Sequence, residues 1–266
     1  MAENGKKRVL ITVRTYPAPA QKGAETSCTA AVTESGEWIR LFPVPYRSLP
    51  EEKKFHKYQW ITARLRKAKR DTRPESHNID IDSIELGDRL PPDNGWAARK
   101  AILAPLMRPS LCAIQTGQQE NGHPTLGLFR PGKIDRLVIK PCEPDWTPKQ
   151  KEILSQTALF EGHIPKDELE KIPFDFRYEF TCAEAACKGH KMLCTDWEMA
   201  ELYRKCKRLY GGGWENKFRE RYEQEMMQRC DTHFYVGTMH GHPSSWIIVG
   251  MFYPPKMAES PQGRLF

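Results

Sequence analysis

The sequence predicts a mainly β protein with α structure (α+β class), whose N-terminal part is a small barrel of the OB type. Three observations support this class. Five short β-rich segments with few helices fill the first hundred positions. Helical and strand patterns mix in the rest of the chain. Its 266 residues are 39% hydrophobic, which suits one large or two small domains with a real core. A generic β-sandwich is the alternative for the N-terminal part.

The N-terminal strands are predicted from β-rich composition and turn signals. They are Arg8–Thr15, Thr26–Thr33, Glu37–Val44, Tyr58–Lys67 and His77–Glu85. Gly36 closes a short hairpin turn between the second and third strands, because glycine tolerates positive φ. In the third strand, Trp38, Arg40 and Phe42 share one face, and Ile39 and Leu41 share the other.

The C-terminal part alternates between helical and strand patterns. The predicted strands are Ser110–Thr116, Thr125–Phe129, Lys133–Lys140, Phe174–Cys182, His233–Thr238 and Ser245–Tyr253. The predicted helices are Trp96–Leu103, Thr147–Thr157, Asp196–Leu209 and Glu215–Gln228. After Pro254 and Pro255 the remaining residues suggest an extended tail.

Several longer motifs point to a known family. They are ITVRTYP, GEWIRLFPVPYRSL, FHKYQWI, RPESH, CxGHxxxxxDWE and WIIVGMFYPP. Between about Arg8 and Pro255 the chain resembles a bacterial family known as the dual OB-containing domain. That resemblance implies two OB-like barrels packed together, at residues 1–105 and 106–255, followed by a tail at 256–266. It brings no settled activity, so any function taken from the fold is analogy.

Charge and hydropathy narrow the function classes. The net charge of +7 favours polyanionic partners weakly. No apolar run approaches the roughly 18 residues that span a bilayer, and the polar N-terminus lacks a signal peptide. We therefore expect a cytoplasmic protein without a membrane partner. Phosphate-loop, dinucleotide, zincin and nucleophile-elbow motifs are missing from the sequence, which leaves no catalytic residue to name.

A cluster of cysteines with one histidine predicts a metal site. With eight cysteines and no secretory signal, a disulfide framework is not expected. Cys182, Cys187, His190 and Cys194 have a spacing close to that of a zinc knuckle. Four protein ligands would make the zinc structural. If only three of them bind, Cys206 or Cys230 could supply the fourth. The alternative is that some of these cysteines are small buried apolar residues.

Basic and aromatic residues on predicted strands indicate a nucleic-acid surface, with DNA favoured over RNA. Cations hold phosphates and aromatic rings stack on bases. The candidate residues are Arg14, Trp38, Arg40, Phe42, Arg64 and Arg66, with the basic run continuing to Arg73. The alternative is a solvated strand end with a charged loop. Some of the aromatic residues must also fill the barrel.

The last five residues resemble the peptide with which bacterial polymerases and repair proteins bind the sliding clamp. Gln262, Leu265 and Phe266 fit the form Q-x-x-L-F, whereas Arg264 departs from the usual Ser or Asp. Leucine and phenylalanine would fill an apolar pocket while glutamine hydrogen-bonds beside it. The alternatives are chance and an apolar end that packs on the domain.

Together these features predict a DNA-associated binding protein that docks on the sliding clamp. Two alternatives remain open. One is a metal-dependent nucleic-acid-processing enzyme that uses Asp196, Glu198 and His190, although Asp196 also suits a helix N-cap. The other is a protein-only adaptor. Replication-linked repair, a mobile element and a defence system are the settings considered.

Overall fold

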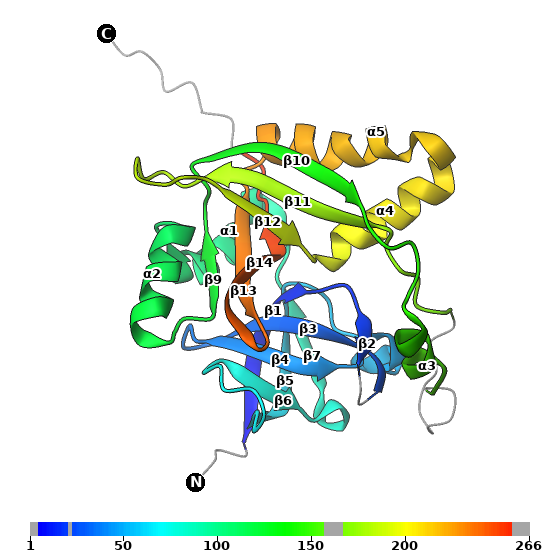
Figure 1. The fold of residues 1–266 in the computed structure, drawn as a ribbon. Coiled ribbons are helices and arrows are strands. Elements are labelled where there is room, and N and C mark those ends of the chain that lie inside the picture. Colours follow the sequence, from blue (N-terminus) through cyan, green and yellow to red (C-terminus); the bar gives the residue numbers. More distant parts are fainter. Residues whose placement is uncertain (1–4, 21–22, 157–166, 257–266) are drawn as a thin grey trace.

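The fold consists of two β-barrels packed against each other, with helices mainly in the C-terminal half (Figure 1). The computed structural model describes residues 5–20, 23–156 and 167–256. No helix in these ranges is long and apolar enough to span a bilayer.

The first barrel is closed and has the strand order of an OB fold. Its strands are β1 (Lys6–Arg14), β3 (Gly23–Thr33), β4 (Trp38–Val44), β5 (Gln59–Lys67) and β6 (Ser76–Ile79). They pair in the order β1-β3-β4-β6-β5, and β5 pairs back with β1. Numbered within the barrel this order is 1-2-3-5-4-1, with the third and fifth strands parallel. The short strands β2 (Ala18–Ala20) and β7 (Glu85–Arg89) extend the sheet from β3 and β5.

Alternate side chains of the strands fill the interior of the first barrel. Val9 and Ile11 of β1, and Ile39 and Leu41 of β4, belong to one buried cluster with β5 side chains. The predicted division of β4 into two faces is therefore confirmed.

The second barrel has the same strand order, but its first strand is bent into two separate parts. Its strands are β9 (Leu126–Phe129), β10 (Lys133–Pro141), β11 (Phe174–Thr181), β12 (His190–Cys194), β13 (His233–Met239) and β14 (His242–Phe252). β10, β11, β12, β14, β13 and β9 pair in that order, and β12 and β14 are parallel. Three residues, 130–132, join β9 to β10, so the chain itself closes the barrel. β8 (Met107–Arg108) adds a short strand beside β9.

Most helices follow the first barrel in sequence and belong to the second. α1 (Asp93–Leu103) ends the first part of the chain. The helices of the second part are α2 (Leu111–Asn121), α3 (Pro148–Gln156), α4 (Trp197–Tyr210), α5 (Trp214–Arg219) and a π-helix (Glu220–Arg229). α4 and α5 lie over β10 and β11 (Figure 1), and their buried side chains share the core of that barrel. Asp196 caps α4 by accepting the amide of Glu198 at 2.8 Å.

The barrels share an apolar interface. Leu10 and Val13 of β1 pack with Leu126, Tyr235 and Phe252 of the second barrel in one buried cluster. Leu10 points away from the interior of the first barrel because it alternates with Val9 and Ile11. A register shift between Ile11 and Val13 brings Val13 to the same outward side. A mutual core of this kind makes the two barrels one packed unit.

Two predicted elements were wrong. Residues Ser110–Thr116, predicted as a strand, form the start of α2, because Ser110 caps the helix by accepting the amide of Ala113 at 3.0 Å. A short apolar run does not separate strand from helix. Residues His77–Glu85, predicted as one strand, are split by a 3-10 turn at Ile81–Ser83, which Asp80 caps.

Candidate metal centre and nucleic-acid interface

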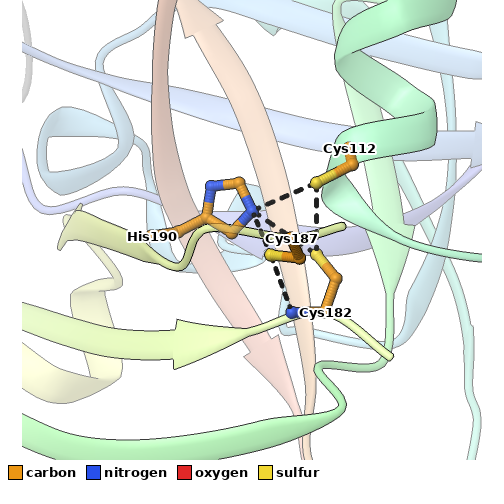
Figure 2. A group of neighbouring side chains, drawn as sticks. All are labelled: Cys112, Cys182, Cys187 and His190. Atoms are coloured by element: carbon orange, nitrogen blue, oxygen red, sulfur yellow. Dashed lines mark hydrogen bonds between the residues drawn. The ribbon is translucent and has the colours of Figure 1, made fainter. Parts of the chain in front are cut away.

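Four potential metal ligands meet at one edge of the second barrel. They are Cys112, Cys182, Cys187 and His190 (Figure 2). Cys112 is the second residue of α2, and Cys182 directly follows β11. Cys187 lies in the β11–β12 loop, and His190 begins β12. The cluster therefore brings together α2 and the β11–β12 hairpin, although Cys112 and Cys182 are 70 residues apart in sequence.

The donor atoms are spaced as tetrahedral zinc requires. All four lie within 4.8 Å of one another. His190 Nε2 is 3.4, 3.5 and 3.3 Å from the sulfurs of Cys112, Cys182 and Cys187. The Cys112 and Cys182 sulfurs are 3.9 Å apart. Ideal zinc bond lengths at the tetrahedral angle place S and N about 3.6 Å apart and two S atoms about 3.8 Å apart.

Local backbone geometry builds the centre. Gly189 has φ +89°, which turns the chain sharply between Cys187 and His190. The amides of Cys182 and Gly189 donate to the Cys187 sulfur at 3.2 and 3.4 Å. At Gly132, an added Cβ would lie 2.7 Å from the backbone of residues 182 and 183, so only glycine allows β10 to start so close to the loop.

The electrostatics of the centre suit a bound cation. Amide donation, first from Cys182, lowers the pKa of the Cys187 thiol. Burial, and then the charge of the Cys182 sulfur, raises the pKa of Cys112 to about 12. A metal ion would offset that repulsion by favouring thiolates. Burial lowers the pKa of His190, which keeps its imidazole neutral and able to coordinate.

The four donors form a closed set. A catalytic zinc keeps a coordination position for water, whereas four protein ligands leave none. These residues could therefore hold a structural ion that ties α2 to the β11–β12 hairpin. His190 also stacks on Phe180, with ring centroids 5.2 Å apart, which fixes the ring orientation.

The fourth ligand differs from the sequence prediction, which named Cys194. Cys194 lies four residues beyond His190 on β12, roughly 13 Å along the strand. Its side chain is buried in the core of the second barrel. Cys206 and Cys230 are also outside the four-residue group.

Two of the predicted nucleic-acid-binding residues pack at the junction of the barrels. The guanidinium of Arg14 lies 4.0 Å from the ring centroid of Tyr46 and 5.1 Å from that of Trp197 on α4. Trp38 meets Tyr235 of β13 edge-on, with centroids 6.1 Å apart. Both side chains bind one barrel to the other.

Arg40 was predicted to face nucleic acid, and this is wrong because the side chain is only 2% exposed. Its guanidinium donates to the hydroxyl and the carbonyl of Thr125 at 2.9 and 2.7 Å. The buried carboxylate of Glu75 accepts the amide and the hydroxyl of the same threonine at 2.8 and 2.6 Å. Thr125 precedes β9, so this polar network also connects the barrels.

The other three predicted residues reach solvent. Phe42 is 42% exposed. Arg64 is exposed but pairs with Asp80 at 2.7 Å. Arg66 is exposed, and within the described residues no carboxylate lies at ion-pair distance from it.

Next to these residues, the fourth-to-fifth-strand loops of the two barrels meet. In the first barrel this loop spans residues 68–75 and exposes Lys69 and Arg70, which have no carboxylate partner among the residues described. Arg73 donates to the Thr238 carbonyl, at the end of β13. The β13–β14 turn thus lies against the first barrel, as the hairpin tip shows in Figure 1.

Two family models match separate parts of the chain. A family model described as "Domain of unknown function (DUF8757)" matches residues 107–266, which is more than half of the chain. The chain belongs to the DUF8757 family. A model described as "Domain of unknown function (DUF8758)" matches residues 5–105. Each model thus covers the strands of one barrel.

Other comparisons are more distant. No curated protein matches the chain. Among solved structures, it is similar to "Crystal structure of the tetrameric p202 HIN2", with 9% sequence identity and a TM-score of 0.33. The match covers 97% of this chain and 95% of that one.

The open face of the second barrel carries charges that neutralise one another. On β10–β12, Glu179 holds Arg136 at 2.6 Å and Lys191 at 2.8 Å. Asp175 pairs with Arg177 at 2.9 Å on the same face. An interlaced surface of this kind is typical of a solvated face.

The residues of the enzyme alternative have structural roles. Asp196 is 3% exposed and, besides capping α4, accepts the amide of Met251 at 3.0 Å. Lys57 of the first barrel lies 3.8 Å from Asp196 and 2.9 Å from Glu198. Burial lowers the pKa of Lys57, but the Glu198 and Asp196 carboxylates outweigh it and raise that pKa overall.

Sequence reasoning missed Cys112, Lys57 and Thr125. Cys112 was placed on a predicted strand, and the signal available was the cap residue Ser110 just before it. Lys57 and Thr125 act on partners in the other barrel, which no local pattern reveals. The predicted clamp-binding residues Gln262, Leu265 and Phe266 lie outside the described residues.

Proposed function

We propose that the chain binds nucleic acid, with DNA favoured over RNA, through a surface on the first barrel. This surface, called here the β5–β6 surface, consists of Phe42, Arg66, Lys69, Arg70 and Asn78. The observation that carries the proposal is that exposed cations without carboxylate partners gather at the fourth-to-fifth-strand loop of an OB barrel. In OB folds that loop, the first-to-second-strand loop and the face of the second and third strands bind oligonucleotides.

A second group of exposed cations lies at the C-terminal end of α4. Lys205, Lys207 and Arg208 are exposed there, beside Tyr210. Their position has a simpler explanation, because cations at a helix C-terminus offset the helix dipole. They supply a control with the same number of charges.

The test is DNA affinity as a function of salt. We expect the R66Q/K69Q/R70Q variant to lose about tenfold or more in affinity and to reduce the slope of log K against log salt by about 2, since each phosphate contact to a single strand contributes about 0.7. The K205Q/K207Q/R208Q variant should keep the wild-type slope. Equal losses in both variants, or no DNA binding by the wild type, would reject this function.

We propose zinc as the ion held by Cys112, Cys182, Cys187 and His190, with a structural role. The closed set of three sulfurs and one imidazole supports it, because such donors favour zinc. Protein purified without added metal should contain one zinc per chain by mass spectrometry. C112S should lower that content, whereas C194S should not. Zinc retained by C112S and lost from C194S would restore the ligand set predicted from sequence.

Docking on the sliding clamp through Gln262, Leu265 and Phe266 remains a proposal from sequence. The match to the DUF8757 model extends to residue 266, so the tail belongs to the matched region. Removal of residues 262–266 should abolish clamp binding and leave DNA binding intact. Clamp binding by a chain that does not bind DNA would instead indicate a protein-only adaptor.

A further inference from the structure

The outward face of β4 is covered along only part of its length. Trp38 and Arg40 point outward and contact Tyr235 and Thr125 of the second barrel. Phe42 is the next outward side chain and is 42% exposed. The second barrel therefore covers the usual OB ligand face and leaves its end at Phe42 open.

Neighbours of Phe42 complete a small polar and cationic frame. Asn78 of β6 donates from its side-chain amide to the Phe42 carbonyl at 2.8 Å. On the other side of β6, Asn78 pairs with Arg66 of β5. Phe42 and Arg66 are thus separated by two strand spacings, about 10 Å. An extended arginine reaches a phosphate beside a base that lies on the ring.

We infer that the β5–β6 surface takes single-stranded DNA, with one base stacked on Phe42 and the flanking phosphates held by Arg66, Lys69 and Arg70. This inference rests on the proposed function and specifies its substrate. An aromatic ring stacks on a base only if the face of that base is free. In a duplex both faces are covered by neighbouring base pairs, so Phe42 discriminates between the two forms.

Tyr210 provides the matched comparison. Among the described residues, Phe42 and Tyr210 are the exposed aromatic side chains, at 42% and 49%. Both stand next to cations without carboxylate partners. Tyr210, however, ends a helix and lies on no OB strand or loop. Because both side chains are exposed, neither alanine variant should affect folding.

The experiment measures the affinity of the full chain for a fluorescent oligonucleotide, single-stranded or annealed to its complement, at one salt concentration. Wild type should bind the single strand more tightly. F42A should weaken single-strand binding about tenfold, since it removes the ring on which one base stacks. It should leave duplex binding within twofold. F42W should restore the loss, and Y210A should match wild type.

Each outcome has a distinct meaning. Equal loss in F42A and Y210A, or an F42A effect as large on duplex as on single strand, overturns the stacking inference while the charge variants still support nucleic-acid binding. Tighter binding of duplex by the wild type also overturns it. No binding of either form rejects the proposed function itself.

Discussion

The two barrels have the same strand order, but the outward face of the second and third strands is covered in one barrel and exposed in the other. In the first barrel, this face is covered by the second barrel at Trp38 and Arg40, and only its end at Phe42 is open. In the second barrel, the corresponding face on β11 and β12 is open, but Glu179 and Asp175 pair with its cations. The same architecture therefore provides an interface in one case and a solvated surface in the other.

The barrels also differ in how they are held together. The first is closed by direct pairing of β5 with β1. The second is closed through the bend between β9 and β10, beside which Cys182 and its metal-ligand partners lie. With the proposed zinc bound, the second barrel would be braced by an ion at a place where the first is closed by a strand ladder.

The largest expected effect is the loss of stability when the metal centre is disrupted. C182S removes one of four ligands, and we expect it to destabilise the chain by more than about 4 kcal/mol, a size typical of the loss of a metal. For a chain of this length that corresponds to a fall of about 10 °C in melting temperature, measured by calorimetry. C142S changes a cysteine outside the cluster and should melt within about 2 °C of wild type. Similar melting of both variants would contradict the structural role of the centre.

The ion cluster between the barrels gives the next effect. K57M leaves the buried Asp196 carboxylate without its counter-ion, which should cost about 3–5 kcal/mol at pH 8 in urea unfolding. Burial raises the pKa of Asp196 to about 6, although Lys57 opposes this shift. Without Lys57 that pKa rises further, so the folded variant takes up a proton before the unfolded chain does.

The pH dependence of K57M follows from this sign. As the pH falls from 8 to 5.5, Asp196 becomes neutral in the folded variant, and the loss of stability relative to wild type should shrink. K53M changes an ion-paired lysine of the same barrel whose partner Asp82 is exposed, and serves as the control. A loss in K57M that does not change between these pH values would exclude Asp196 as its source.

A smaller effect is expected at Trp38. W38A removes part of the junction and should destabilise by about 2 kcal/mol, below the range for a fully buried tryptophan because Trp38 is half-buried. Its DNA affinity should equal that of wild type, since the ring packs edge-on against Tyr235 of the second barrel. Lower DNA affinity with unchanged stability would show that this face opens to ligand.

Sequence patterns predicted most of the barrel strands, because alternation reports which side chains face a core, but they did not predict β12. They did not reveal that both faces of β4 are buried near Arg40, since a second barrel covers the outward one. Arg40 and Phe42 have the same position in the pattern, yet one contacts Thr125 and the other contacts solvent. Burial between the barrels depends on residues far apart in the sequence, so the local periodicity of apolar residues does not predict it.

The metal centre shows the same limit on a smaller scale. The spacing of Cys182, Cys187 and His190 was sufficient to bring them together, because one hairpin carries all three. Cys112 comes from α2, a segment whose short apolar run indicated a strand. Cys194 has a suitable spacing in the sequence, but an extended strand carries it away from His190.

The smallest expected effect tests the open face of the second barrel. Arg136 is 65% exposed and pairs with Glu179, which also holds Lys191. R136Q leaves Lys191 to neutralise that carboxylate, so we expect DNA affinity within twofold of wild type and an unchanged unfolding midpoint. R66Q removes one cation without a carboxylate partner and should weaken binding several-fold in the same titration. If R136Q were the weaker binder, DNA would lie on β10–β12, and the covered face of the first barrel would have no part in recognition.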